Sequence, residues 1–367
     1  MDLILDELVQ RVRAAAAGGT PLRIRGGGSK DFYGEPPQGE LLDTTPLAGV
    51  TSYEPTELVV TVRAGTRLAD LEALLAERGQ CLPFEPPHFG GAPTVGGMVA
   101  AGLAGPARAS VGAVRDFVLG LTMINGRGEL LSFGGQVMKN VAGYDVSRLM
   151  VGAMGTLGLI VEVSLKVLPL PRAEATLKFR MDQAEALRRL NAWGGRPLPL
   201  NASCWVEDAG VPTLYLRLRG AEAAVEAACR TMGGERQDNA EVAPDWTLCR
   251  DQRLPWFEAR GERDLWRLSV PQTAPVLDLP EAPLIEWHGG LRWVRAAAAD
   301  GDRLRRAADR AGGHATLFRG AGIKTAGARH VTRFAPLAAP LDRIHRELKR
   351  QFDPSSIFNR GRLYPDL

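Results

Sequence analysis

Glycines and small polar residues gather in four segments of the first half of the chain, and the first of these suits phosphate. It reads Arg25-Gly26-Gly27-Gly28-Ser29-Lys30 and follows a predicted strand, Leu22–Arg25. Consecutive glycines let a backbone approach a ligand closely and turn several N–H groups toward one point. Ser29 and Lys30 add a hydroxyl donor and a positive charge. The run matches neither a Walker A loop nor G-x-G-x-x-G, so a plain glycine-rich turn remains an alternative.

The second segment is built almost wholly from small residues. It reads Pro93-Thr94-Val95-Gly96-Gly97-Met98-Val99-Ala100-Ala101-Gly102-Leu103-Ala104-Gly105-Pro106. A bulky planar ligand that packs against backbone needs small side chains around it. A tightly packed buried loop or helix would use the same composition, so both interpretations stay open.

Two further segments each precede a predicted strand. Ser110-Val111-Gly112-Ala113-Val114-Arg115-Asp116 leads into 117–124, and its last two residues could instead form a surface ion pair. Lys139-Asn140-Val141-Ala142-Gly143-Tyr144-Asp145 is followed by Gly155-Thr156-Leu157-Gly158 and by Ile160-Val161-Glu162. Backbone amides in such a strand can hydrogen-bond the polar edge of a planar ligand without any charged side chain.

The histidines and cysteines give little sign of metal chemistry. Of five histidines, His88 is the candidate for a general base, because it lies between Pro87 and the second glycine-rich segment. The others are scattered and more typical of structural residues, and we predict no metal site. The four cysteines lack the C-x-x-C spacing of local iron–sulfur or zinc motifs, and we expect free thiols at Cys81, Cys204, Cys229 and Cys249.

Apolar periodicity and turn residues place regular elements around these segments. In the first part we predict a helix from Leu3 to Gly18-Gly19, a strand over 58–62, a helix capped by Thr66 and stopped by Gly79, an Asn125-Gly126 hairpin joining 117–124 to 129–133, and a strand over 156–168. The prolines at 169 and 171 mark a domain boundary. Beyond it we predict strands over 176–179, 213–218, 265–270 and around 285–294, and helices over 184–193, 222–232, 302–311 and 336–352.

Bulk composition excludes some function classes. The net charge is +3, with 45 basic and 42 acidic residues, so no strong field points to nucleic acid. A hydrophobic content of 45% is ordinary for a globular protein with a sizeable core. Residues 1–20 lack the pattern of a signal peptide, and no apolar run is as long as a membrane span. We expect a cytoplasmic protein, able to associate with the inner face of the membrane through partners.

Together the four segments resemble, in order and spacing, the FAD-binding module of the vanillyl-alcohol oxidase and p-cresol methylhydroxylase (PCMH) type. The resemblance is denser to the FAD-binding subunits of bacterial glycolate oxidases, through Phe84-Glu85-Pro86-Pro87-His88, 96–106, 114–120, 137–145 and the tail 352–363. It implies an α+β fold: a PCMH-type FAD-binding domain of two α+β subdomains over 1–170, a smaller α+β cap, substrate or partner-binding domain over 171–335, and a helix and tail over 336–367 that return to the FAD domain.

The same resemblance assigns the cofactor and its contacts. Ser29-Lys30 stands where covalently flavinylated relatives often carry His, so non-covalent FAD is expected. The implied FAD contacts are Arg25, Gly26, Gly27, Gly28, Ser29, Lys30, Pro93, Thr94, Val95, Gly96, Gly97, Gly102, Gly105, Pro106, Ser110, Val111, Gly112, Arg115, Asp116, Gly143, Tyr144, Gly155, Thr156, Gly158, Ile160, Val161 and Asn359.

The resemblance also implies an activity: oxidation of glycolate, a 2-hydroxy acid, to glyoxylate. Electrons would pass to a complex containing a second FAD-dependent hydroxyacid dehydrogenase subunit and an iron–sulfur subunit. Three alternatives remain open. The chain could be a self-sufficient FAD-dependent 2-hydroxyacid or alcohol oxidoreductase, a structural subunit that retains the FAD fold, or an NADPH-using reductase of the cell-wall precursor type.

Overall fold

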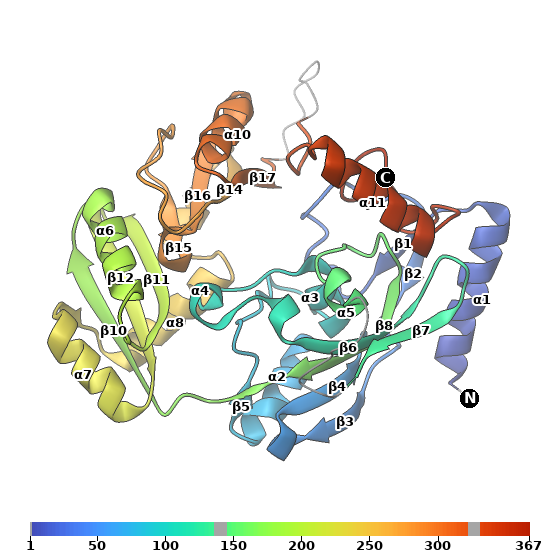
Figure 1. The fold of residues 1–367 in the computed structure, drawn as a ribbon, viewed down its shortest axis with the longest axis horizontal. Helices are drawn as coiled ribbons and strands as arrows, with labels where there is room; N and C mark the ends of the chain where they lie inside the picture. Colours follow the sequence, from blue (N-terminus) through green and yellow to red (C-terminus); the bar gives the residue numbers. More distant parts are fainter. Residues whose placement is uncertain (1, 136–144, 322–330) are drawn as a thin grey trace. The chain divides into compact units, whose positions relative to one another are not determined.

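The computed structural model describes residues 2–135, 145–321 and 331–367, which fold into two compact units (Figure 1). The first unit comprises Met1–Leu103, Ala113–Leu170 and Pro336–Leu367, and the second comprises Ala104–Gly112 and Pro171–Ala335. The fold is α+β, as predicted. Residues 104–112, which we expected in the FAD domain, group with the second unit. Within the described ranges no helix combines the length and the apolarity that a bilayer span requires.

The first unit is organised around a five-stranded antiparallel sheet in the order β3-β4-β8-β6-β7. Its strands are β3 (Val50–Glu54), β4 (Val59–Arg63), β6 (Val118–Ile124), β7 (Leu130–Gly134) and β8 (Leu159–Lys166). β4 and β8 are rich in β-branched residues and mostly buried, as central strands require. Smaller pairs join β1 (Leu22–Arg25) to β2 (Glu40–Asp43) in parallel and β5 (Gln80–Cys81) to β9 (Leu168–Pro169).

The helices of the first unit include the three predicted over 3–18, 66–79 and 336–352, and two short ones that were not predicted as helices. They are α1 (Leu3–Gly18), α2 (Leu68–Glu77), α3 (Val95–Ala101), α5 (Val146–Leu149) and α11 (Ala339–Phe352). α1 is confirmed, with the Asp2 side chain at its N-cap and Gly19 at its end. The predicted cap of α2 is wrong, because Arg67 occupies the N-cap position. The Thr66 hydroxyl instead bonds the backbone of Gly49.

The predicted β6–β7 hairpin is confirmed, but its turn works differently from the expectation. Neither Asn125 nor Gly126 has a positive φ, and that conformation falls on Gly128. The Asn125 side-chain oxygen accepts hydrogen bonds from the backbone of Arg127 and Glu129. Gly126 is required by close packing, because a Cβ there would overlap Asp353 in the C-terminal segment. The turn is therefore shaped by residues more than two hundred positions away.

The second unit is an eight-stranded antiparallel sheet in the order β13-β10-β12-β11-β15-β16-β14-β17. Its strands are β10 (Ala173–Arg180), β11 (Leu200–Asp208), β12 (Val211–Gly220), β13 (Glu235–Arg236), β14 (Asp264–Ser269), β15 (Leu284–Glu286), β16 (Leu291–Ala296) and β17 (His314–Arg319). The single strand predicted around 285–294 is in fact two, β15 and β16, paired across a short turn.

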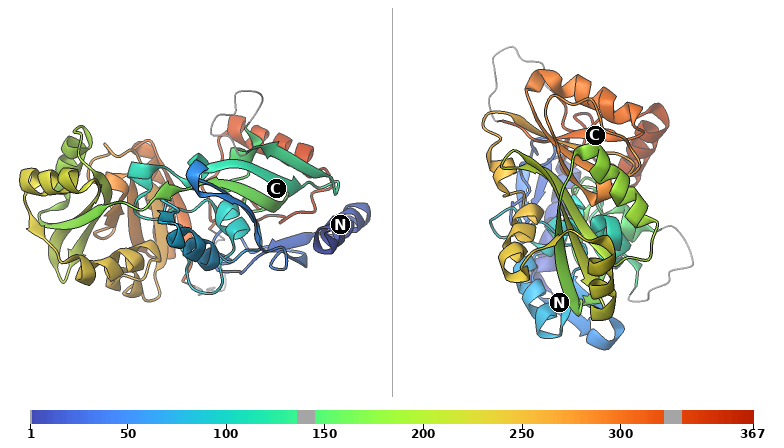
Figure 2. Two further views of the ribbon diagram at one scale, coloured as in Figure 1. Left: turned by 90° about the horizontal axis from the view of Figure 1, so that it is seen from below. Right: turned by 90° about the vertical axis from the view of Figure 1, so that its left-hand side faces the viewer.

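Helices cover this sheet in two clusters (Figure 2). α6 (Gln183–Gly194) and α7 (Glu222–Met232) pack on β10 and β12 through a core that includes Leu187, Leu190 and Val225. α10 (Gly301–Arg310) packs on β14 and β17 around the buried ring of Trp266. The remaining helices of the unit are α4 (Arg108–Val111), α8 (Asn239–Arg250) and α9 (Pro255–Glu258).

A buried ion pair fastens the C-terminal segment to the first unit. Lys349 of α11 donates to the Asp353 carboxylate at 2.7 Å and to the carbonyl oxygens of Thr156 and Phe358, both at 2.8 Å. Asp353 also accepts the backbone N–H groups of Ile357 and Phe358. The side chains of Lys349 and Asp353 are 6% and 0% exposed, so every partner of these charges is supplied by the protein.

We predict that Lys349→Met lowers the free energy of unfolding by about 3–5 kcal/mol, because it leaves the Asp353 carboxylate buried without its counter-charge. Arg350→Met is the matched control: Arg350 is the next residue and pairs with Glu347 on an exposed surface, so its loss should cost less than about 1 kcal/mol. Urea unfolding of both variants measures the difference. Equal midpoints would contradict the assignment.

Candidate functional site

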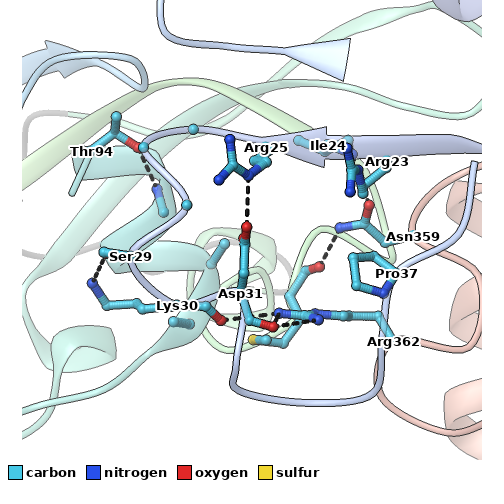
Figure 3. A pocket seen from close by; sticks show the side chains of 17 residues that line it. Arg23, Ile24, Arg25, Ser29, Lys30, Asp31, Pro37, Thr94, Asn359 and Arg362 are labelled. Carbon is cyan, nitrogen blue, oxygen red and sulfur yellow. Dashed lines mark hydrogen bonds and ion pairs between the residues drawn. The ribbon is translucent and has the colours of Figure 1, made fainter. Parts of the chain in front are cut away.

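The glycine-rich run after β1 forms one wall of a pocket within the first unit (Figure 3). The pocket measures about 90 Å³, which leaves room for part of a ligand and not for a whole dinucleotide. Its lining combines strand, loop, helix and tail, and includes Arg23, Arg25, Gly26, Gly27, Gly28, Ser29, Lys30, Thr94, Gly97, Asn359 and Arg362. The structure thus brings together nine of the predicted contacts from three parts of the chain, with Arg23 and Arg362 beside them.

The glycines of the run are required where the loop meets the segment before α3. A Cβ on Gly27 would overlap the carbonyl oxygen of Ala92, and one on Gly26 would overlap the Thr94 hydroxyl. The Thr94 oxygen in turn accepts the N–H of Gly97 at 3.2 Å and caps α3. Backbone therefore lies against backbone on this side of the pocket, as the glycine composition predicts.

The donors around the pocket suit an anionic group. Arg23 and Arg25 are two residues apart on β1, so they share one face of the strand, and both line the pocket. Arg25 is paired with Asp31 at 2.7 Å, and the Lys30 ammonium lies 3.1 Å from the Ser29 hydroxyl. The Nε atom of Arg23 is buried and has no hydrogen-bond partner in the part of the chain that the structure describes. A buried cationic donor without a partner is costly, and a phosphate oxygen in the pocket would satisfy it. These residues fit a diphosphate group.

Two residues of the tail, Asn359 and Arg362, form hydrogen bonds that hold β1 and the loop in place. The Asn359 amide accepts the N–H of Ile24 at 2.8 Å and donates to the carbonyl of Met154 at 2.6 Å. Arg362 donates to the carbonyl oxygens of Lys30, Asp31 and Glu35 at 2.6–3.2 Å. Asn359 therefore holds β1 in place, and its direct contact with a cofactor stays a prediction. Neither Arg23 nor Arg362 was among the predicted FAD contacts.

Segment 104–112 is held within the second unit. Trp287 donates its indole N–H to the Gly105 carbonyl at 3.0 Å, and the Arg108 guanidinium lies 4.4 Å from the centre of its ring. The Ser110 hydroxyl is 2.9 Å from Nε2 of His288. Trp287 and His288 both have positive φ, 54° and 53°, in the turn between β15 and β16. The predicted residues Gly105, Pro106, Ser110, Val111 and Gly112 all belong to this segment.

Other predicted contacts are not among the residues that line the pocket. Pro93 precedes α3, and Val95, Gly96 and Gly102 belong to α3 or its cap; Gly96 packs on Ala64. The Asp116 carboxylate bonds the Ala113 N–H, and Arg115 is exposed. The remaining predicted contacts precede or lie in β8: Gly155, Thr156, Gly158, Ile160 and Val161. Gly143 and Tyr144 lie outside the described residues.

The candidate base His88 is paired with a carboxylate. Its Nε2 lies 2.8 Å from Glu72 on α2, and the two side chains are 20% and 30% exposed. His88 is not among the residues that line the loop pocket. Its catalytic role stays a prediction.

The second unit holds a larger cavity of about 440 Å³ between the sheet and α8–α9. Its walls include Tyr215, Trp246 and Trp256, and Asp208 and Asp245 also line it. Burial and the hydrogen bond to Asp208 raise the pKa of Tyr215, so that hydroxyl stays protonated. Carboxylates in the lining disfavour a small carboxylate ligand in this cavity.

Comparison with known proteins identifies the class. The model of an FAD binding domain family matches residues 5–134. Two solved structures of alkyldihydroxyacetonephosphate synthase share the fold; one superposes with a TM-score of 0.65 over 96% of this chain and 74% of that chain, at 15% identity. The glycolate oxidase subunit GlcD of Bacillus subtilis is 29% identical over 183 residues, 49% of this chain and 39% of that protein. The fold is therefore that of a PCMH-type FAD-binding protein, and the chain is an FAD-dependent oxidoreductase with FAD as its cofactor.

One relative aligns over nearly the whole length. The glycolate oxidase subunit GlcE of Escherichia coli is 48% identical over 361 residues, which cover 98% of this chain and 97% of that protein. The chain belongs to the family of FAD-binding glycolate oxidase subunits represented by GlcE.

We predict that Arg23→Gln weakens FAD binding about tenfold, the effect of losing a charge-assisted hydrogen bond, while the free energy of unfolding of the apoprotein does not fall. The reason is that the buried Nε atom has no described partner to lose. Arg11→Gln, on exposed α1, is the control and should leave FAD affinity intact. Titration of apoprotein with FAD and urea unfolding separate the two effects. A destabilised apoprotein with normal affinity would refute the role.

Acid sensitivity should arise in part from His288. Burial lowers the pKa of His288 from 6.5 to about 4, so the ring is neutral at neutral pH. Since the unfolded chain takes up the proton more readily, this contribution to stability is complete above about pH 6.5 and is lost as the pH falls toward about 4.

We predict that the thermal midpoint of the natural protein falls across this window more steeply than that of His288→Asn, in which Asn tolerates the left-handed backbone. His314 and His345, whose pKa values are also lowered by burial, are present in both proteins. Parallel pH profiles would show that His288 makes no such contribution.

Proposed function

We propose that this chain is the FAD-binding subunit of a glycolate oxidase that converts glycolate to glyoxylate within a complex and passes the electrons to a partner subunit. The observation that carries the proposal is the near full-length similarity to a glycolate oxidase subunit in a chain with a pocket suited to a flavin diphosphate. FAD, when bound, supplies the hydride acceptor for oxidation of the substrate α-carbon.

The chain's own residues bind and orient the cofactor. The run Gly26-Gly27-Gly28 would bind the diphosphate together with Arg23 and Lys30. Arg362 holds the loop in shape through hydrogen bonds to its carbonyl oxygens. Among the other predicted contacts, those of 155–161 belong to the same unit as the pocket and would meet other parts of FAD. Binding is non-covalent: no histidine is among the residues of the pocket lining, and Ser29-Lys30 stands in the loop.

A partner completes the electron path. The four cysteines of the chain lack the spacing that holds an iron–sulfur cluster, so we assign that role to a separate iron–sulfur subunit. We place the oxidation of glycolate on a second FAD-dependent hydroxyacid dehydrogenase subunit. The acidic lining of the cavity in the second unit supports this, because it disfavours the carboxylate of glycolate. Residues 171–335 would serve as the cap or partner-binding domain of a cytoplasmic complex that docks on the membrane through its partners.

Anaerobic reduction tests the division of labour. We predict that the chain purified alone is yellow, keeps its visible flavin absorbance when glycolate or D-lactate is added, and is bleached by dithionite. Addition of the dehydrogenase subunit with glycolate should then bleach it. A prompt loss of the flavin band with glycolate alone would show that this chain carries its own hydroxyacid site, and a colourless protein that takes up no FAD would refute the proposal.

A further inference from the structure

The second unit contains a cavity to which the proposed function gives no ligand. It measures about 440 Å³, within the range of about 300–1,000 Å³ that is typical of small-molecule sites. Its lining comes from β11, β12 and β16, from α8 and α9, and from the turns beside them. All of these elements belong to the second unit, so the cavity is complete within that unit.

Much of the cavity wall is apolar and aromatic. Trp246, which is 6% exposed, and the half-buried Trp256 line it together with Val242 and Leu254. The indole N–H of Trp246 donates to the Thr176 hydroxyl at 3.0 Å, which fixes the orientation of that ring. Indole rings in a wall stabilise the body of an aromatic ligand through burial of apolar area and through ring–ring contact.

The charged residues of the lining are mostly acidic. They are Glu207, Asp208 and Asp245, with Arg295 as a basic residue beside them. The Arg295 guanidinium is bonded to Glu281 at 2.8 Å, which compensates its charge, and it lies over the Trp256 ring at 4.5 Å from the centre. The lining therefore carries an excess of negative charge, which favours a cation over an anion or a neutral molecule.

The hydrogen-bonding groups of the lining point to the same kind of ligand. Tyr215 donates its hydroxyl proton to Asp208 at 2.6 Å, and the Lys178 ammonium lies 4.0 Å from the same carboxylate. Asp245 is exposed and forms no hydrogen bond or ion pair with any residue that the structure describes. Since the donors of Tyr215 and Arg295 are already used and the acceptors of Asp245 are not, a ligand should bring N–H donors and a positive charge.

We propose that this cavity binds an organic cation: a protonated amine or amidine carried on an aromatic body. The two tryptophans take the aromatic body, and the Asp245 carboxylate takes the charged end. Such a ligand is opposite in charge to a hydroxy acid. The inference does not depend on the proposed function, because no residue of the pocket in the first unit takes part in it.

Calorimetric titration of the full chain, carrying its FAD, tests the proposal with two probes of the same shape. Benzamidine is protonated at neutral pH, and benzamide is its neutral counterpart. We expect saturable binding of benzamidine with a dissociation constant on the order of 1 mM, as suits so small a molecule. Benzamide should bind at least about threefold more weakly, because it brings no charge to Asp245.

Variants place the binding in this cavity. Asp245→Asn should weaken benzamidine binding about three- to tenfold and leave benzamide binding unchanged, a selectivity that a damaged fold would not produce. Trp256→Leu should weaken the binding of both probes. Glu241→Gln is the matched control, because Glu241 is exposed one helical turn earlier on α8 and is not among the lining residues, so it should bind both probes normally.

Three results would overturn the proposal. The first is the absence of saturable benzamidine binding to the natural chain. The second is equal affinity for benzamidine and benzamide, which would mean that the cavity does not select a positive charge. The third is an unchanged affinity for benzamidine in Asp245→Asn, which would place the bound cation elsewhere on the protein.

Discussion

The first unit depends on one buried ion pair. Lys349 and Asp353, one helical turn apart, form an ion pair with each other and hydrogen bonds to backbone groups. These contacts fix the path of the segment after α11. That path delivers Asn359 to β1 and Arg362 to the glycine-rich loop. The loop's conformation is thus imposed from the far end of the chain. A loop that is already shaped presents its N–H groups without paying for their ordering when a phosphate arrives.

In the second unit, too, polar side chains fix the position of a short segment, but through a different set of contacts. Its strained Trp287–His288 turn holds a short segment of the FAD binding domain family by one indole hydrogen bond, one stacked guanidinium and one imidazole. In both units, polar side chains form hydrogen bonds to backbone or hydroxyl groups at or near the predicted cofactor contacts. Arg23 differs from these residues, because its buried Nε atom has no hydrogen-bond partner among the described residues and could contact a ligand directly.

Local signals explain which parts the sequence could predict. α1, β1, α7 and the β6–β7 hairpin depend on residues within a few positions, and periodicity and turn residues located them. The glycine run predicted this wall of the pocket, because only glycine at position 27 lets the backbone of Ala92 come so close. β2, β11 and α8 carry weak periodicity and were missed. The role of Arg362 and the membership of residues 104–112 depend on contacts across roughly 180 to 330 positions of sequence, which no local pattern contains.

The discontinuity of the first unit has a consequence for how the protein is made. Its sheet and glycine-rich loop are complete in sequence by Leu170, yet Asn359 and Arg362 leave the ribosome after the entire second unit. Through most of synthesis the nascent chain therefore carries the glycine-rich loop without the hydrogen bonds from Asn359 and Arg362. We therefore expect the loop to reach its final shape late, and a chain interrupted before Pro336 lacks the hydrogen bonds that Asn359 and Arg362 supply, however well its early strands have folded. The order of synthesis thus places the support of the loop after the whole second unit has emerged.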